Sequence, residues 1–199
     1  QTLLKRCAAP VFTTERAARE LSWRLPGAET RLDALDFGIP QSIGEFAVTA
    51  FPTSHDAPGS CGFRLDAAGG AVGVLTDTGY VTDEAADILE GVDLAVLEAN
   101  HDIETLRSGP YPYYLKQRIL GAQGHLSNED AARFAAVLAQ SGTSEIILAH
   151  LSRENNTPAM AQTAVERALS AAGVSPLLSV APRDCLGPAH TVSRRSVCR

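Results

Sequence analysis

The chain has 199 residues, of which 45% are hydrophobic and 20% are charged, so it is long enough for one globular domain with a sizeable core. With 17 basic and 23 acidic residues it carries a formal net charge of −6, which argues against simple electrostatic binding of nucleic acid. Bound divalent cations could still reverse the charge of a local site and hold a phosphate there.

The four cysteines are far apart and include no C-x-x-C pair, which excludes a zinc finger and does not require disulfides. No apolar run reaches the roughly 20 residues that a helix needs to cross a bilayer, and no signal-peptide pattern opens the chain. We therefore expect a cytoplasmic protein. Because the chain begins with Gln1 rather than Met, we also expect it to be a fragment.

Helix and strand patterns follow one another along most of the chain. A short helix and the strand APVFTT precede ERAARELSWRL, whose apolar spacing predicts a helix from Glu15 that ends before Pro26. Apolar runs predict strands at 45–51, 62–65, 71–76, 93–98, 145–150 and 177–181. Further helices are expected after Thr82, Ser127 and Thr157, and 109–120 is expected to be a loop that leads into a helix.

Strands first, and strands alternating with helices later, are typical of a mixed α/β layer structure. We expect a single domain over residues 1–186. Residues 187–199 have no apolar period and are expected to form a mobile tail.

Three of the apolar strands lead to a residue that could bind a metal. EFAVTAFPTSHD leads to His55, AVGVLTD to Asp77 and EIILAH to His150. A buried strand has little reason to end in an imidazole or a carboxylate unless that end lines a site, although each residue alone could be a satisfied core histidine or a turn aspartate. These donors suit zinc, manganese or iron, so together they predict a metal site.

A fourth strand, in DLAVLEANHD, ends in Glu98 and is followed by His101, while His125 lies in GHLSNEDAARF just before a helix start. Glu98 could accept one ring N–H of His125 and orient the ring, which would leave the other nitrogen to deliver a proton. The alternatives are a solvated carboxylate at a strand end, a capping or loop histidine at position 101, and a solvent-exposed loop histidine at position 125.

Four motifs in this order, VLTDTG, LEANHD, GHLSNEDAA and LAHLSREN, resemble those of the metallo-β-lactamase-fold hydrolases. They are most similar to the YycJ-like (WalJ-like) branch, which is related to the nucleases tRNase Z and RNase J, and VAPRD near the end fits the same branch. The resemblance covers about residues 50–185. It implies an αββα sandwich that is incomplete at its N-terminus, and two divalent metal ions, zinc, manganese or iron, in the complete protein.

The resemblance also implies roles for individual residues. His55, Asp77 and His150 match metal ligands, with Asp77 as the carboxylate that bridges the two metals. Glu98 and His125 match the proton-donating pair of tRNase Z-like members, whereas His101 has no clear counterpart and stays a candidate site residue. Further candidates for contact with the substrate or for support of the site are Ser127, Asn128, Arg153 and Asn155.

The sequence departs from the family pattern in one large respect, because it contains no H-x-H-x-D-H motif. We expect the chain to be an N-terminally truncated piece in which a sheet edge and part of the core surface are uncovered. We also expect this chain alone to bind metal poorly and to have little or no hydrolase activity.

The resemblance predicts a metal-dependent phosphodiesterase, a nuclease acting on DNA ends, in which metal-bound hydroxide attacks phosphorus and His125 protonates the leaving oxygen. Tyr111, Tyr113 and Tyr114, with Lys116 and Arg118, could form an edge for base stacking and phosphate contact, or only a packing loop. Two other functions stay open: a hydrolase of small esters, lactones or thioesters on the same fold, and a non-catalytic domain that has lost its metal site. Nucleic acid is the expected partner, no membrane is expected, and the oligomeric state is not predicted.

Overall fold

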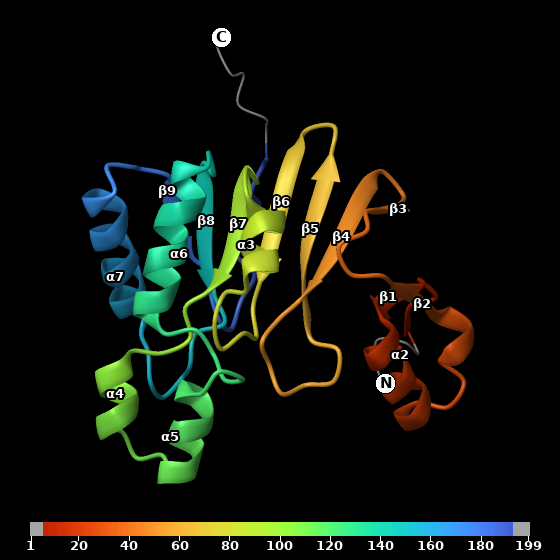
Figure 1. Ribbon diagram of the computed structural model, residues 1–199, viewed down its shortest axis with the longest axis horizontal. Coiled ribbons are helices and arrows are strands. Elements are labelled where there is room, and N and C mark those ends of the chain that lie inside the picture. The colour runs from red at the N-terminus through yellow and green to blue at the C-terminus, as the bar shows by residue number, and fades with distance from the viewer. Residues whose placement is uncertain (1–5, 193–199) are drawn as a thin grey trace.

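The computed structural model describes residues 6–192, and a seven-stranded mixed sheet runs through the centre of that part (Figure 1). The order of its strands is β3-β4-β5-β6-β7-β8-β9. Their bounds are β3 Gln41–Ile43, β4 Phe46–Pro52, β5 Cys61–Ala67, β6 Gly70–Leu75, β7 Leu94–Glu98, β8 Glu145–Ala149 and β9 Leu177–Val180. The six strands predicted from 45 to 181 are all confirmed.

The sheet changes from antiparallel to parallel at β6. Strands β3 to β6 pair antiparallel, and a tight turn at Ala68 and Gly69 joins β5 to β6. Strands β6 to β9 pair parallel. The carboxyl ends of β6, β7 and β8 therefore lie at one edge of the sheet, the lower edge in Figure 1, next to which two short helices project.

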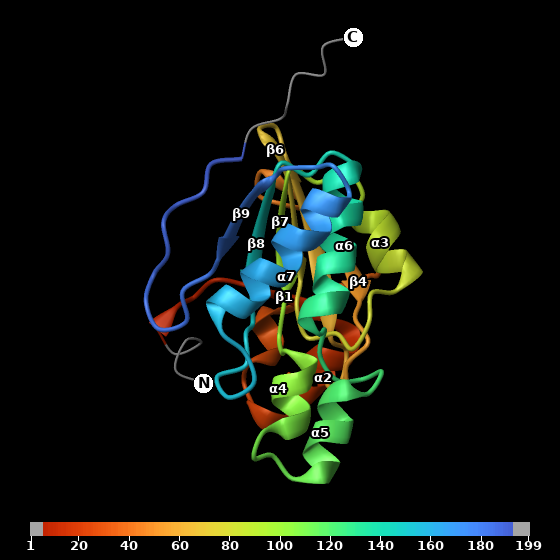
Figure 2. The ribbon, with the colours of Figure 1, turned by 90° about the vertical axis from the view of Figure 1, so that its left-hand side faces the viewer.

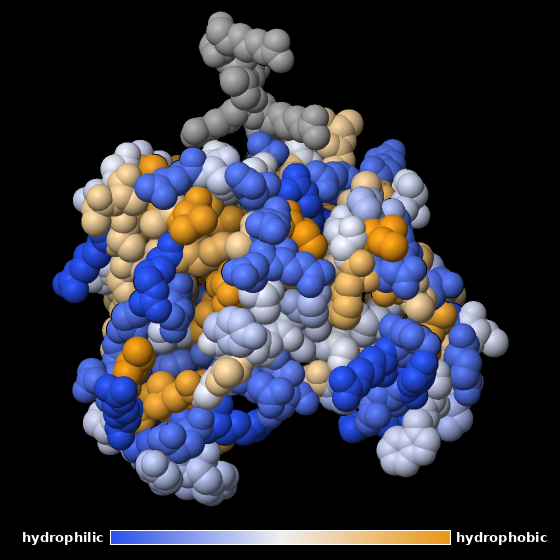
Figure 3. All heavy atoms as spheres, viewed as in Figure 1, coloured by the Kyte–Doolittle hydropathy of each residue, from blue (hydrophilic) through white to orange (hydrophobic). Residues whose placement is uncertain are grey.

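Three helices cover one face of the sheet, as the edge-on view in Figure 2 shows: α3 (Asp83–Leu89), α6 (Asn128–Gln140) and α7 (Pro158–Ala171). The side chains of Thr82, Ser127 and Thr157 accept hydrogen bonds from the first turns of these helices, which confirms the predicted starts. Seen from the side of Figure 3, apolar side chains are scattered among hydrophilic ones. Among the described helices, none is long and apolar enough to cross a membrane.

The core lies between these helices and the sheet. Its fully buried side chains include Phe51, Leu75, Leu97, Leu138 and Ile146. The strand β7 is apolar at four consecutive positions because it is central and parallel, with neighbours on both sides. This rigid centre fixes where the ends of β6, β7 and β8 lie.

A second, two-stranded sheet packs with a helix near the start of the chain. It pairs β1 (Val11–Thr14) in parallel with β2 (Leu32–Leu35), and the helix is α2 (Glu15–Arg24). The predicted helix is confirmed, and it ends before Pro26. Its apolar residues are not in the core, however, because α2 has no buried residue and Trp23 is 80% exposed.

The mixed α/β class is confirmed. Of the four layers of the expected sandwich, the described residues contain one helix layer and one large sheet, with the smaller β1–β2 unit beside it. Four elements were not predicted: β2, β3, the short helix η1 (Glu29–Arg31) and α4 (Ile103–Ser108). Within 109–120, where a loop leading into a helix is expected, the helix is α5 (Tyr113–Leu120). The first five residues and 193–199, most of the expected tail, lie outside the described part.

Candidate metal centre

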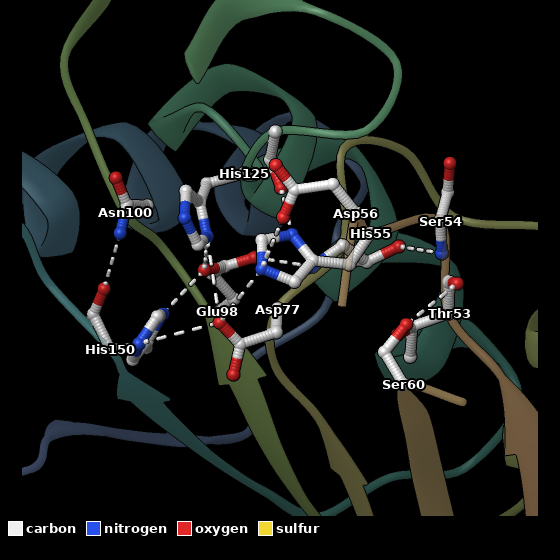
Figure 4. Close-up of polar contacts among 12 residues, drawn as sticks. Thr53, Ser54, His55, Asp56, Ser60, Asp77, Glu98, Asn100, His125 and His150 are labelled. Carbon is white, nitrogen blue, oxygen red and sulfur yellow. Dashed lines mark hydrogen bonds and ion pairs between the residues drawn. The ribbon is translucent and has the colours of Figure 1, made fainter. Parts of the chain in front are cut away.

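The candidate ligands predicted from the strand ends lie together at the carboxyl edge of the sheet (Figure 4). Asp77 follows β6, His150 follows β8, and His55 lies in the loop after β4. The parallel pairing of β6, β7 and β8 accounts for the meeting of Asp77 and His150, since parallel strands carry their carboxyl ends to one edge.

Asp77 and His150 share a rare backbone conformation. Their φ angles are 56° and 57°, and no other non-glycine residue in the described part of the chain has a positive φ. The left-handed region costs about 1–2 kcal/mol for an ordinary residue and persists where the surroundings impose it. Here Asn100 Nδ2 donates to the His150 carbonyl at 2.8 Å. The surrounding fold therefore holds the backbone of Asp77 and His150 in a strained conformation.

The Asp77 carboxylate lies between His55 and His150. Its Oδ1 is 3.8 Å from Nε2 of His55 and 3.7 Å from Nε2 of His150. Two ligands on one tetrahedral zinc ion, each with a bond of about 2.0–2.1 Å, lie about 3.3–3.5 Å apart. The separations are thus close to those that metal ligands require, and an oxygen flanked by two imidazoles suits a bridging carboxylate.

Each of the two flanking histidines points Nε2 at Asp77 because its Nδ1 is hydrogen-bonded on the other side of the ring. His55 Nδ1 lies 3.0 Å from the carbonyl oxygen of Gly124, which can only accept, so this nitrogen carries the proton. His150 Nδ1 lies 2.6 Å from Glu98 Oε1. An acceptor behind the ring that fixes its tautomer is the usual support of a metal-binding histidine. The donor set and its support fit a divalent metal.

Glu98 is completely buried and surrounded by hydrogen-bond donors. Its Oε1 faces Nδ1 of His125 at 2.8 Å as well as His150, and its Oε2 accepts from the backbone amides of Thr78 at 3.1 Å and Leu126 at 3.2 Å. Burial alone would raise the pKa of this carboxyl, but the hydrogen bonds from His125 and His150 outweigh it and lower the pKa to about 2. Glu98 is therefore ionised at neutral pH.

Four donors occupy the oxygens of Glu98, so this residue orients histidines and has little capacity left for a metal. Asp77, Glu98, His125 and His150 do have donor atoms within 4.8 Å of one another. The hydrogen bonds assign Glu98 to the support of His125 and His150. The Glu98 hydrogen bond raises the pKa of His150, against the effect of burial.

His125 lies between the two other histidines. Its ring centroid is 4.9 Å from that of His55 and 5.3 Å from that of His150. Its backbone amide donates to the Ile119 carbonyl, and two residues later Ser127 caps α6. With Nδ1 on Glu98, its Nε2 has no partner in the described part of the chain.

Four of the other predicted site residues are buried, whereas Arg153 is exposed. His101 is 1% exposed, and neither ring nitrogen has a hydrogen-bond partner among the described residues. Ser127, Asn128 and Asn155 are also buried, and Asn128 pairs with Asn156. Their burial favours a role in supporting the scaffold over direct contact with a substrate.

The candidate tyrosine edge lies on α5 and the turn before it. Tyr113 and Tyr114 are 76% and 74% exposed. Lys116 donates to the carbonyls of Arg107 and Gly109, and Arg118 pairs with Asp56, so both cations are used within the chain. The tyrosines are therefore available for stacking, whereas the two cations already have hydrogen-bond or ion-pair partners within the chain.

One supporting residue, Asn100, was missed in the sequence. It stands between Glu98 and His101 in LEANHD, and its side chain and carbonyl hold His150 and the amide of Ser152. Its position after a strand end was the only available signal.

A mixed sheet with histidines and carboxylates gathered at the carboxyl ends of its strands defines an α/β protein with a candidate divalent-metal centre. Residues 1–151 match the family described as the beta-lactamase superfamily domain, which is three quarters of the chain. The chain belongs to that superfamily, as its motifs predict.

Curated relatives agree with this assignment. The chain is 42% identical to the exodeoxyribonuclease WalJ of Streptococcus pneumoniae over 137 residues, which cover 69% of this chain and 51% of that protein. It is 34% identical to the exodeoxyribonuclease YycJ of Bacillus anthracis over 174 residues, 86% of this chain and 65% of that protein. The chain thus matches only about half to two thirds of the length of these relatives.

Solved structures show the same fold. The metallo-beta-lactamase fold protein YhfI of Bacillus subtilis superimposes with a TM-score of 0.65 at 19% identity, over 86% of this chain and 61% of that one. Zinc-bound PqqB of Methylobacterium extorquens gives a TM-score of 0.61 at 18% identity, over 90% of this chain and 65% of that one.

Proposed function

We propose that the protein is a metal-dependent phosphodiesterase that acts on the ends of DNA. The observation that carries this proposal is the ionised, buried Glu98, which binds Nδ1 of both His125 and His150. One carboxylate thereby orients a metal-ligand candidate and a proton-donor candidate at the same time. The names of the exodeoxyribonuclease relatives support DNA as the substrate.

Each residue then has a distinct task. His55, Asp77 and His150 would hold divalent metal, which we propose to be two ions of zinc, manganese or iron. When bound, the metal supplies the nucleophile and offsets the charge of the phosphate. The Glu98 carboxylate stabilises the positive charge on a protonated His125, whose Nε2 donates its proton to the leaving oxygen.

The proton from His125 matters most for a substrate with a poor leaving group. The alkoxide that leaves a DNA phosphodiester needs a proton, whereas a thiolate leaves without one. A DNA substrate would place the protein in the cytoplasm.

We predict that His125→Ala selectively lowers hydrolysis of DNA. The rate with Mn²⁺ and end-labelled DNA should fall by about 100-fold or more, because general acid catalysis contributes about 10²–10⁴-fold. The rate with a small thioester should change little. Since the chain lacks the H-x-H-x-D-H motif, the rates are measured with the protein in excess over substrate, so that slow single turnovers are detected.

His190→Ala is a matched control, because His190 also bonds to a glutamate, Glu145, but lies away from the centre. A His125→Ala variant that loses both activities equally, or a wild type that cleaves only the thioester, would favour the small-ester alternative.

A further inference from the structure

A hollow of about 440 Å³ opens directly beside His150. It lies between the loop that joins β8 to α7 and the segment that follows β9, and His150 itself forms part of its wall. Its wall also includes Leu151, Arg153, Val180, Ala181, Pro182 and Arg183. The volume falls within the range of about 300–1,000 Å³ that is usual for small-ligand pockets.

Two arginines give this hollow a positive rim. Arg183 Nη2 donates to the carbonyls of Leu151 at 3.2 Å and Ser152 at 3.0 Å, which fixes the guanidinium without neutralising it. Arg183 forms no ion pair with any residue that the structure describes, whereas Arg153 pairs with Asp184. In a chain with a net charge of −6, this leaves a local excess of positive charge next to the centre.

A second hollow, beside His55, has the opposite character. It measures about 380 Å³ and is lined by Glu15 and Asp36 together with a single arginine, Arg16. A phosphate would be repelled there by two carboxylates. Of the two hollows that adjoin the centre, the one beside His150 is therefore the better site for a phosphate.

We propose that the hollow beside His150 binds a single nucleotide of the DNA end, with its phosphate on Arg183, which has no ion pair among the described residues. The inference rests on the proposed function, since it places one terminal nucleotide next to the phosphodiester to be cut. A guanidinium offers paired N–H donors that match phosphate oxygens. Val180, Ala181 and Pro182 provide an apolar wall for the sugar or base.

The test is a calorimetric titration of the chain with thymidine 5′-monophosphate in EDTA, so that no metal contributes to binding. Arg183→Ala should weaken binding by about 10- to 100-fold, the effect of losing a charged hydrogen bond. Arg167→Ala, which removes an exposed arginine of α7 outside the hollow, should change the affinity by less than about twofold. Inorganic phosphate should bind more weakly than the nucleotide, and thymidine should not bind measurably.

Arg183 also holds a loop through its hydrogen bonds to Leu151 and Ser152, so a second variant tests the hollow without removing Arg183. Ala181→Phe fills the hollow while leaving both arginines in place, and it should also abolish binding. The inference is contradicted if the wild type does not bind the nucleotide, if Arg167→Ala weakens binding as much as Arg183→Ala, or if phosphate alone binds equally well.

The outcome is separable from that of the proposed function, because nucleotide binding in EDTA requires neither metal nor turnover. Metal-dependent DNA cleavage without nucleotide binding would contradict the pocket alone. Nucleotide binding together with metal-dependent thioester turnover but no DNA cleavage would contradict the nuclease function alone.

Discussion

Glu98 shows how a single buried residue can organise a site. A buried carboxylate is costly unless its oxygens are fully hydrogen-bonded, and here two imidazoles and two backbone amides meet that need. The arrangement also fixes the tautomers of His125 and His150. The Glu98–His125 contact was predicted from the sequence as a pair, but the second contact with His150 was not, since nothing in the sequence ties residues 98 and 150 together.

The left-handed backbone at Asp77 leads to a prediction about stability. In EDTA, Asp77→Gly should be more stable than Asp77→Ala by about 1 kcal/mol, because glycine adopts φ near 56° without a steric penalty. Asp87, an exposed residue within α3, serves as the control. There the order should reverse by about 1 kcal/mol in favour of alanine. Urea unfolding measures all four variants, and equal stabilities at position 77 would argue against strain.

His101 should make the protein sensitive to mild acid. Burial lowers the pKa of its ring to about 4, with a further contribution from nearby His125, while the unfolded ring titrates near 6.5. As the pH falls from 6.5 to 4, the His101 ring takes up a proton in the unfolded state but not in the folded state. The free energy of unfolding should therefore fall across this window, by at most about 3 kcal/mol from this residue.

The His101→Leu variant lacks this group and isolates its effect. The difference in unfolding free energy between wild type and variant, measured in urea at intervals from pH 7 to 4, should shift steadily in favour of the variant. A difference that stays constant with pH would show that the folded ring accepts a proton and is not shielded as the structure indicates.

At the scale of elements, the sequence predicted what local signals encode. The capping residues Thr82, Ser127 and Thr157 predicted the starts of the three helices. The long apolar strands predicted the central sheet. The strand β2 was missed because it is short and its pairing depends on a distant partner, Leu35 with Thr14. The edge strand β3 pairs locally, Ile43 with Phe46, and was missed because its three residues are too few to show an alternating pattern. The helix α4 was missed because it has only six residues, too few to show a period.

The N-cap of α6, Ser127, contributes to the stability of the fold and lies two residues after His125. Ser127 Oγ accepts from the Asp130 amide at 3.0 Å, so Ser127→Ala should cost about 1 kcal/mol of unfolding free energy. The loss should appear in thermal unfolding as a lower midpoint. Ser141→Ala, at the other end of α6, tests whether any loss of a serine has the same effect. An undiminished midpoint for Ser127→Ala would mean that the cap contributes little.

At the scale of the whole molecule, net charge and fold have to be considered together. The net charge of −6 disfavours DNA, so the proposed binding of DNA would depend on local features: the candidate metal centre and the arginines beside His150. The αββα architecture came from family resemblance and not from composition. The ligand positions at the carboxyl edge could be predicted from strand ends alone, because parallel strands direct their ends to one place.

The assignment of Asp77, His55 and His150 as metal ligands, with Glu98 orienting His150 and not bound to the metal, is the part of the site on which the proposed chemistry depends. It is tested most directly by titrating the chain with Co²⁺ and following the visible absorption of the bound ion. We predict weak binding by the wild type, its loss in Asp77→Asn and His150→Ala, and a reduction of about 10- to 100-fold in Glu98→Gln. His101→Leu should bind as the wild type does. Undiminished Co²⁺ binding in both Asp77→Asn and His150→Ala would contradict the account.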